Sequence, residues 1–180
     1  MAGLGVLVIL LFPGSAEQDT DYHFLMVRTA WVDHSYFVKV WARPLFTTLF
    51  APVGLLGYTA ARFFALAISL AMAWQTCRLA NDLEMPRPWL AIAILLGQPV
   101  FVEVFSDLYT ETLFALVFVL ALRCHLRGRT KLGMLIASLL PLARPEGVFL
   151  CVLWGALILV QPAGASDYVP FFRRVISRIP

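Results

Sequence analysis

The acidic pair in Asp19-Thr20-Asp21 has the residue types and the spacing from which two kinds of chemistry can be built. Two carboxylates this close can share a divalent cation, or one can act as a general base while the other orients it. His23 and His34 follow nearby and could assist. Two solvated acids in an exposed loop would have the same spacing, so the pair alone does not separate these interpretations.

A second acidic group, Glu103, Asp107 and Glu111, repeats at every fourth position. Residues four apart share one face if the segment is helical. A charged side chain costs about 2.5 to 3.5 kcal/mol at the centre of a membrane helix, so carboxylates at membrane depth tend to mark functional sites. The cost falls near the interface, and solvated acids at a helix end remain the alternative.

The cationic candidates are Arg62, inside an apolar run, and Arg144, in Ala143-Arg144-Pro145-Glu146-Gly147. A guanidinium at the end of a helix can bind a lipid phosphate through two parallel hydrogen bonds. Arg144 could equally reach lipid headgroups without specificity, or pair with Glu146. The motif leaves both possibilities open.

The elements that position these residues are predicted from composition. The chain is 61% hydrophobic and 14% charged, whereas about a quarter of a typical soluble domain is charged. A hydrocarbon core about 30 Å thick needs roughly 20 mostly apolar residues per helix, so five or six spans would fit. We therefore predict an all-α protein of the cell membrane, a single multi-pass transmembrane domain over residues 1–180, with apolar segments near 4–12, 58–79, 89–105, 112–126, 132–142 and 148–160.

Two details of this arrangement follow from particular residues. Pro99 is expected to kink the third apolar segment. Residues 23–41 mix apolar, polar and aromatic side chains, which favours short helices lying at the membrane interface within the first outer loop.

Orientation is predicted from the basic residues. The cluster Arg123, His125, Arg127, Arg129 and Lys131 contains no acid, and Lys and Arg accumulate in short cytoplasmic loops. This cluster is therefore assigned to the cytoplasm. If successive segments cross the membrane in opposite directions, residues 14–40 and the 106–111 turn lie outside, and the basic tail that contains Arg173, Arg174 and Arg178 lies inside. The basic residues are not interleaved with stacking aromatics, so nucleic acid is not expected as a partner.

Taken together, these features resemble the C-type glycosyltransferases, multi-span enzymes that take a sugar from a polyprenyl-phosphate carrier. The resemblance is carried, in order along the chain, by Asp19-Thr20-Asp21-Tyr22-His23, Trp41-Ala42-Arg43-Pro44-Leu45-Phe46, Ala60-Ala61-Arg62, Tyr109-Thr110-Glu111-Thr112 and Ala143-Arg144-Pro145-Glu146-Gly147. It implies that Asp21 or Asp19 is the catalytic carboxylate and that Asp107 and Glu111 form the second acidic group. Members of that superfamily are several hundred residues long, so the chain is expected to be the N-terminal portion of such a fold.

The resulting hypothesis is an inverting transfer of a hexose or pentose, mannose-like or another, from a polyprenyl-phosphate sugar to a lipid, glycan or protein acceptor on the outer face, among membrane lipids. Asp21 is the preferred base because it directly precedes the aromatic start of an interfacial helix. The predicted site residues are Asp21 and Asp19 as catalytic groups and Asp107, Glu111, Arg62, Arg144, Glu146, His23 and Arg43 as binding groups, with Mg²⁺ or Mn²⁺ as a candidate cofactor. The alternatives are a fragment of a transporter or a non-catalytic membrane subunit.

Overall fold

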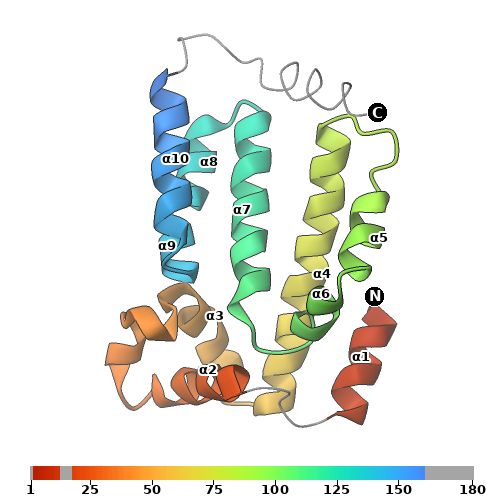
Figure 1. Cartoon of the computed structure of the whole chain (residues 1–180). Coiled ribbons are helices and arrows are strands. Elements are labelled where there is room, and N and C mark those ends of the chain that lie inside the picture. Colours follow the sequence, from red (N-terminus) through yellow and green to blue (C-terminus); the bar gives the residue numbers. More distant parts are fainter. Residues whose placement is uncertain (1, 13–17, 161–180) are drawn as a thin grey trace.

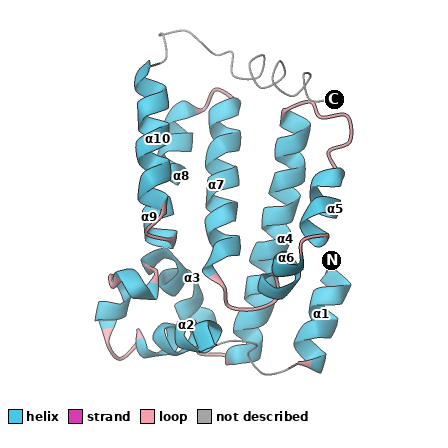
Figure 2. Ribbon diagram, in the orientation of Figure 1, coloured by secondary structure: helices cyan, strands magenta, loops and turns pink. Residues whose placement is uncertain are grey.

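The computed structural model describes residues 2–12 and 18–160, and in these ranges the chain is a bundle of helices (Figure 1). Figure 2 shows helices and loops with no strand in the described ranges, which confirms the all-α prediction. In chain order the elements are α1 (Ala2–Leu11), α2 (Gln18–Thr29), the 3₁₀ helices η1 (His34–Phe37) and η2 (Val40–Ala42), α3 (Pro44–Gly54), α4 (Tyr58–Asp82), α5 (Leu90–Leu96), α6 (Pro99–Val104), α7 (Thr110–Leu126), α8 (Thr130–Ala137), α9 (Leu140–Ala143) and α10 (Gly147–Val160).

Two predicted segments are each broken into two helices. Proline lacks an amide hydrogen and disfavours helical geometry in the preceding residue. The expected kink at Pro99 is therefore a full break, because α5 stops at Leu96 and Pro99 opens α6. In the same way, Pro141 lies in the first turn of α9, and the segment predicted over 132–142 divides into α8 and α9.

α4 and α7 run antiparallel at the centre of the bundle. At one end, Tyr58 Oη in α4 donates to the carboxylate of Asp107, just before α7, at 2.7 Å. At the other end, Arg123 Nε in α7 donates to Asp82 Oδ2 in α4 at 2.7 Å. Figure 1 shows the two helices side by side with opposite chain directions.

α8 packs closely against α7 because Gly133 has no side chain. A Cβ atom added to this glycine would lie 2.9 Å from the carbonyl oxygen of Ala121 in α7. Small residues at such contacts let two helix backbones approach one another.

Two apolar clusters form the core. The larger joins α2, α3, α4 and α7–α10, and includes Phe46 and Phe50, whose stacked rings lie 4.0 Å apart between centroids. The smaller lies between α1, α4 and α6 and includes Ile9, Leu66 and Phe105. Packing therefore extends to α2 and α3, which Figure 1 shows gathered at the lower end of the bundle.

In the described part of the chain, α4 is the one helix whose length and composition suit a membrane span. α7 has 17 residues, or about 25 Å at 1.5 Å per residue, which is shorter than a typical hydrocarbon core. The prediction of five or six spans is thus not matched by the lengths of the individual helices. The predicted basic tail with Arg173, Arg174 and Arg178 lies outside the described residues.

Candidate functional site

The buried carboxylate of Asp107 is the centre of the first polar group at the lower end of the bundle. Its Oδ1 accepts hydrogen bonds from Tyr58 Oη at 2.7 Å and from the amide of Leu108 at 2.9 Å. Arg62 Nε lies 3.8 Å from the same oxygen and donates to the carbonyl of Ser106 at 3.0 Å. Arg62 and Asp107 are both only 3% exposed.

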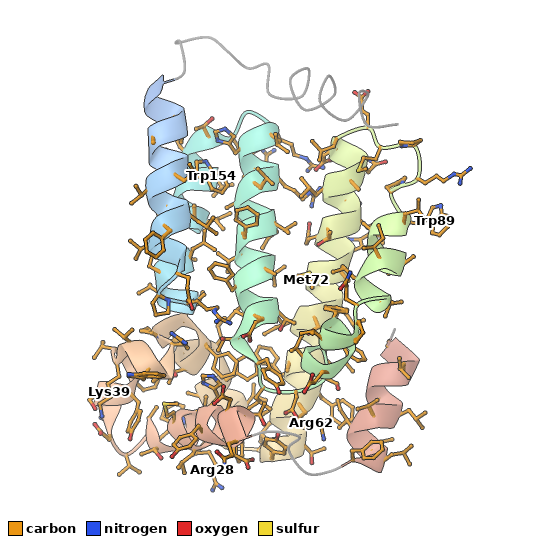
Figure 3. All side chains as sticks on the ribbon, in the orientation of Figure 1. Arg28, Lys39, Arg62, Met72, Trp89 and Trp154 are labelled. Carbon is orange, nitrogen blue, oxygen red and sulfur yellow. The ribbon has the colours of Figure 1, made fainter. Side chains whose placement is uncertain are left out.

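The remaining contacts of this network tie α1 and α2 to α4. Arg62 Nη1 donates to the carbonyl of Phe12, directly after α1, and Tyr58 Oη lies 3.5 Å from Thr20 Oγ1 in α2. Figure 3 shows Arg62 near the foot of α4. The two predicted binding residues, Arg62 and Asp107, are therefore engaged by the protein itself, and these contacts suit a role in holding the turn before α7.

Arg144 is the centre of a second group, in the turn between α9 and α10. Its guanidinium donates to Glu111 at the start of α7 and lies 3.3 Å from Glu146 Oε1. The pairing with Glu146 was one of the possibilities that the motif left open, and Glu111 joins it from a distant part of the sequence. The hydrogen bond from Arg144 holds the pKa of Glu146 below its ordinary value.

His23 lies on α2 against the first turns of α3, with its ring 5.3 Å from that of Phe46 between centroids. Its Nδ1 is buried and has no hydrogen-bond partner in the part of the chain that the structure describes. Burial lowers the pKa of His23, as does the positive charge of Arg43, while Asp19 and Glu111 oppose the shift. Arg144 lowers it slightly as well, so these five residues share one electrostatic neighbourhood.

Arg43 connects η2 to α3 in an unusual backbone conformation. Its φ of 53° and ψ of 83° place a non-glycine residue in the left-handed region, which side chains with a Cβ rarely adopt and which occurs often at functional sites. Its Nε is buried without a hydrogen-bond partner among the described residues. Sequence reasoning included Arg43 but carried no signal for this geometry.

The two acids of the Asp19-Thr20-Asp21 pair lie on α2, not in a loop as expected. Residues two apart on a helix point about 200° away from one another, so the pair does not suit a shared cation. Asp19 lies one turn before His23 and Asp21 lies on another side of α2, and both acids are exposed. Among the described residues there is no group of three His, Cys, Asp or Glu suited to a metal ion.

The predicted alignment of the second acidic group depended on a continuous helix, and the helix is interrupted. α6 ends at Val104 and α7 begins at Thr110. Glu103 is exposed on α6, Asp107 is buried in the turn, and Glu111 pairs with Arg144. The spacing therefore does not place the three acids on one face.

Two residues of the site were missed by sequence reasoning, Tyr58 and Thr20. Tyr58 lies one helical turn before Arg62, and this spacing could have indicated that the two side chains act together. Thr20 was treated only as the residue between two acids, yet it is buried beside the hydroxyl of Tyr58.

The upper end of the bundle holds a separate basic group. Asp82 accepts from Arg123 at 2.7 Å and from Arg127 at 2.8 Å, and Arg123 also donates to Gln75. The basic cluster predicted over 123–131 is thus partly neutralised by an acid from α4, while Arg129 and Lys131 remain exposed.

Comparison of the chain with protein-family models, with curated proteins and with solved structures gave no match.

Proposed function

We propose that the chain is an integral membrane protein in which α4 crosses the bilayer and the other apolar helices pack beside it. Charged residues on α4 lie at its ends, and residues 63–77 contain none. From Arg62 to Asp82 the helix rises about 30 Å, which equals the thickness of a hydrocarbon core. Large apolar side chains are also exposed on the outer helices, among them Phe149, which is 78% exposed on α10.

We further propose that the protein transfers a sugar from a polyprenyl-phosphate carrier to an acceptor hydroxyl at the lower end of the bundle. The observation that carries this proposal is the shared neighbourhood of carboxylate, imidazole and guanidinium groups. These groups come from α2, the start of α3, the start of α7 and the α9–α10 turn. Beyond an end of α4, such a site would lie at the depth of lipid headgroups.

In the proposed reaction, the acceptor oxygen attacks the anomeric carbon of the sugar from the face opposite the carrier. The bond between that carbon and the phosphate oxygen breaks, and the polyprenyl phosphate leaves with the electron pair. A carboxylate takes the acceptor proton, a contribution of typically 10²- to 10⁴-fold. Arginine stabilises the charge that develops on the departing phosphate.

The geometry favours Asp19 over Asp21 as this base. The charge of Asp19 raises the pKa of His23 against the lowering effect of burial, and Glu111 and Arg144 also influence this pKa. Both acids are exposed, but Asp21 lies on another side of the helix from Asp19 and His23. The preference for Asp21 rested on its place in the sequence and did not anticipate that both acids belong to one helix.

A transporter would instead need charged groups near the middle of its helices. α7 carries Glu111, Arg123 and His125 near its two ends and no charged residue between 112 and 122. Together with the uncharged centre of α4, this distribution supports an enzyme whose site lies at one membrane surface.

The test is transfer of radiolabelled sugar from defined polyprenyl-phosphate donors in membranes that carry the protein. Asp19→Asn keeps the shape of the side chain and removes the base, so turnover should fall by about two to four orders of magnitude. Asp33→Asn is the matched control, because Asp33 is exposed and its partners within the part of the chain that the structure describes are its sequence neighbours Ser35 and Lys39. If turnover were unchanged in Asp19→Asn and collapsed in Asp21→Asn, Asp21 would be the base. If neither substitution reduced turnover, a carboxylate base on α2 would be contradicted.

A further inference from the structure

The arginines at the lower end of the bundle differ in how many of their hydrogen-bond donors are already used. Arg62 donates to two backbone carbonyls and lies beside Asp107. Arg144 is held between Glu111 and Glu146. Arg43 has no ion pair within the described residues, and its Nε is buried without a partner. A buried donor of this kind is costly to leave unpaired, so it indicates a ligand that supplies the acceptor.

The backbone of Arg43 indicates the same residue independently. Its left-handed conformation is unfavourable for a side chain with a Cβ, and glycine would be accommodated there without strain. Strained residues of this kind are found where the orientation of a side chain matters for function.

A second unpaired nitrogen lies on the helix that packs against the start of α3. His23 packs against Phe46, in the first turn of the helix that Arg43 opens, and its Nδ1 is buried without a partner among the described residues. Arg43 lies three residues before Phe46, against which His23 packs, and its positive charge helps to lower the pKa of His23. One imidazole and one guanidinium with unused nitrogens can together hold a tetrahedral oxyanion, since the guanidinium fork matches phosphate geometry.

We propose that Arg43 and His23 bind the phosphate of the prenyl carrier, and that Arg144 organises the acidic side of the site through Glu111 and Glu146. This proposal rests on the proposed function for the identity of the ligand. It differs from the interpretation of the sequence, in which Arg62 and Arg144 were the cationic candidates for binding a lipid phosphate.

The experiment measures binding, not transfer, by calorimetric titration of farnesyl phosphate into the full chain in neutral detergent. Arg43→Gly removes the guanidinium while keeping the backbone angles favourable, so the variant should fold with unchanged or higher thermal stability. We expect its affinity for farnesyl phosphate to fall about tenfold to a hundredfold, the loss typical of a hydrogen bond to a charged group. His23→Phe keeps a ring against Phe46, removes both nitrogens, and should weaken binding about tenfold.

Arg28→Ala is the matched control, because Arg28 lies on the same helix as His23 but is exposed and points away from the bundle (Figure 3). It should bind as the wild type does. Farnesol, which lacks the phosphate, should not compete. Equal affinity in Arg43→Gly, a greater loss in Arg144→Ala than in Arg43→Gly, or no binding by the wild type would each overturn the proposal.

Two further arms separate this proposal from the proposed function. Phosphate binding that depends on Arg43, with no sugar transfer from any donor, would support the phosphate site and count against the transferase. Phosphatidic acid that binds through Arg43 as tightly as farnesyl phosphate would identify a phospholipid headgroup as the ligand, which would overturn the assignment to the carrier.

Discussion

The buried pair of Arg62 and Asp107 yields the most quantitative prediction of the structure. Two unit charges 3.8 Å apart attract by about 4 kcal/mol at the effective dielectric constant of 20 that describes partly buried sites. Removing one partner of a buried pair leaves the other charge uncompensated and costs about 3 to 5 kcal/mol. We therefore expect Asp107→Asn and Arg62→Ala each to lower the free energy of unfolding by about this amount.

The substitutions are chosen to separate charge from hydrogen bonding. In Asp107→Asn the amide oxygen can still accept from Tyr58 and Leu108, so the loss reports the charge. Tyr58→Phe removes one hydrogen bond to a charged group and should cost about 1.5 to 3 kcal/mol. Glu103→Gln on the exposed surface of α6 is the control, with an expected change within about 0.5 kcal/mol.

The assay is denaturant unfolding in detergent micelles, followed by far-ultraviolet circular dichroism. The double variant Arg62→Ala/Asp107→Asn should lose less stability than the two single variants combined, by about 1 to 3 kcal/mol, because it leaves no unpaired charge. Additive losses, or single losses below about 1 kcal/mol, would refute the idea that this pair holds the turn before α7.

The remaining predictions concern packing, ionisation and orientation. Gly133→Ala should lower the thermal unfolding temperature, because its Cβ would lie 2.9 Å from a backbone carbonyl of α7, an overpacking that costs about 1 to 3 kcal/mol. Gly155→Ala is the control, because its Cβ would meet open space, and it should be neutral or stabilising by up to about 1 kcal/mol. The pKa of His23 is lowered in the folded protein, so its contribution to stability is complete above about pH 6.5 and is lost as the pH falls toward the folded pKa. His23→Phe should therefore make the free energy of unfolding depend less on pH between about pH 5 and 8. In a cysteine-free background, an outside-confined reagent should modify Lys39→Cys and spare Arg129→Cys, and the reverse pattern would contradict the orientation inferred from the basic cluster.

The helical fold could be predicted because apolar runs and prolines act locally. The run that begins near Tyr58 became α4, and Pro99 interrupts the next segment where proline chemistry requires it. Helix lengths were less predictable, because they also depend on how the helices pack. Gly147 lies so close to α9 that an added Cβ would be 2.5 Å from the carbonyl oxygen of Leu140, and no local pattern indicates this contact.

The site was predicted in its residue types but not in its partnerships. Nothing in the sequence links Arg62 to Asp107, since their contact depends on how α4 meets a turn far along the chain. The same is true of Arg144 and Glu111. The left-handed backbone of Arg43 left no local signal, because neither glycine nor asparagine marks the position.

Sugar transfer in sealed vesicles of known orientation tests the proposed function most directly. Vesicles that carry the wild-type protein would receive a series of radiolabelled polyprenyl-phosphate sugars, and the labelled product would be assigned to the inner or outer face by its accessibility to a membrane-impermeant glycosidase. The proposed function, with the orientation inferred from the basic cluster, predicts labelled product on the face that also exposes Lys39. The proposed function would be contradicted if folded protein, with the stability expected of an intact Arg62 and Asp107 pair, transferred sugar from none of the donors. Product on the face that exposes Arg129 would contradict it as well.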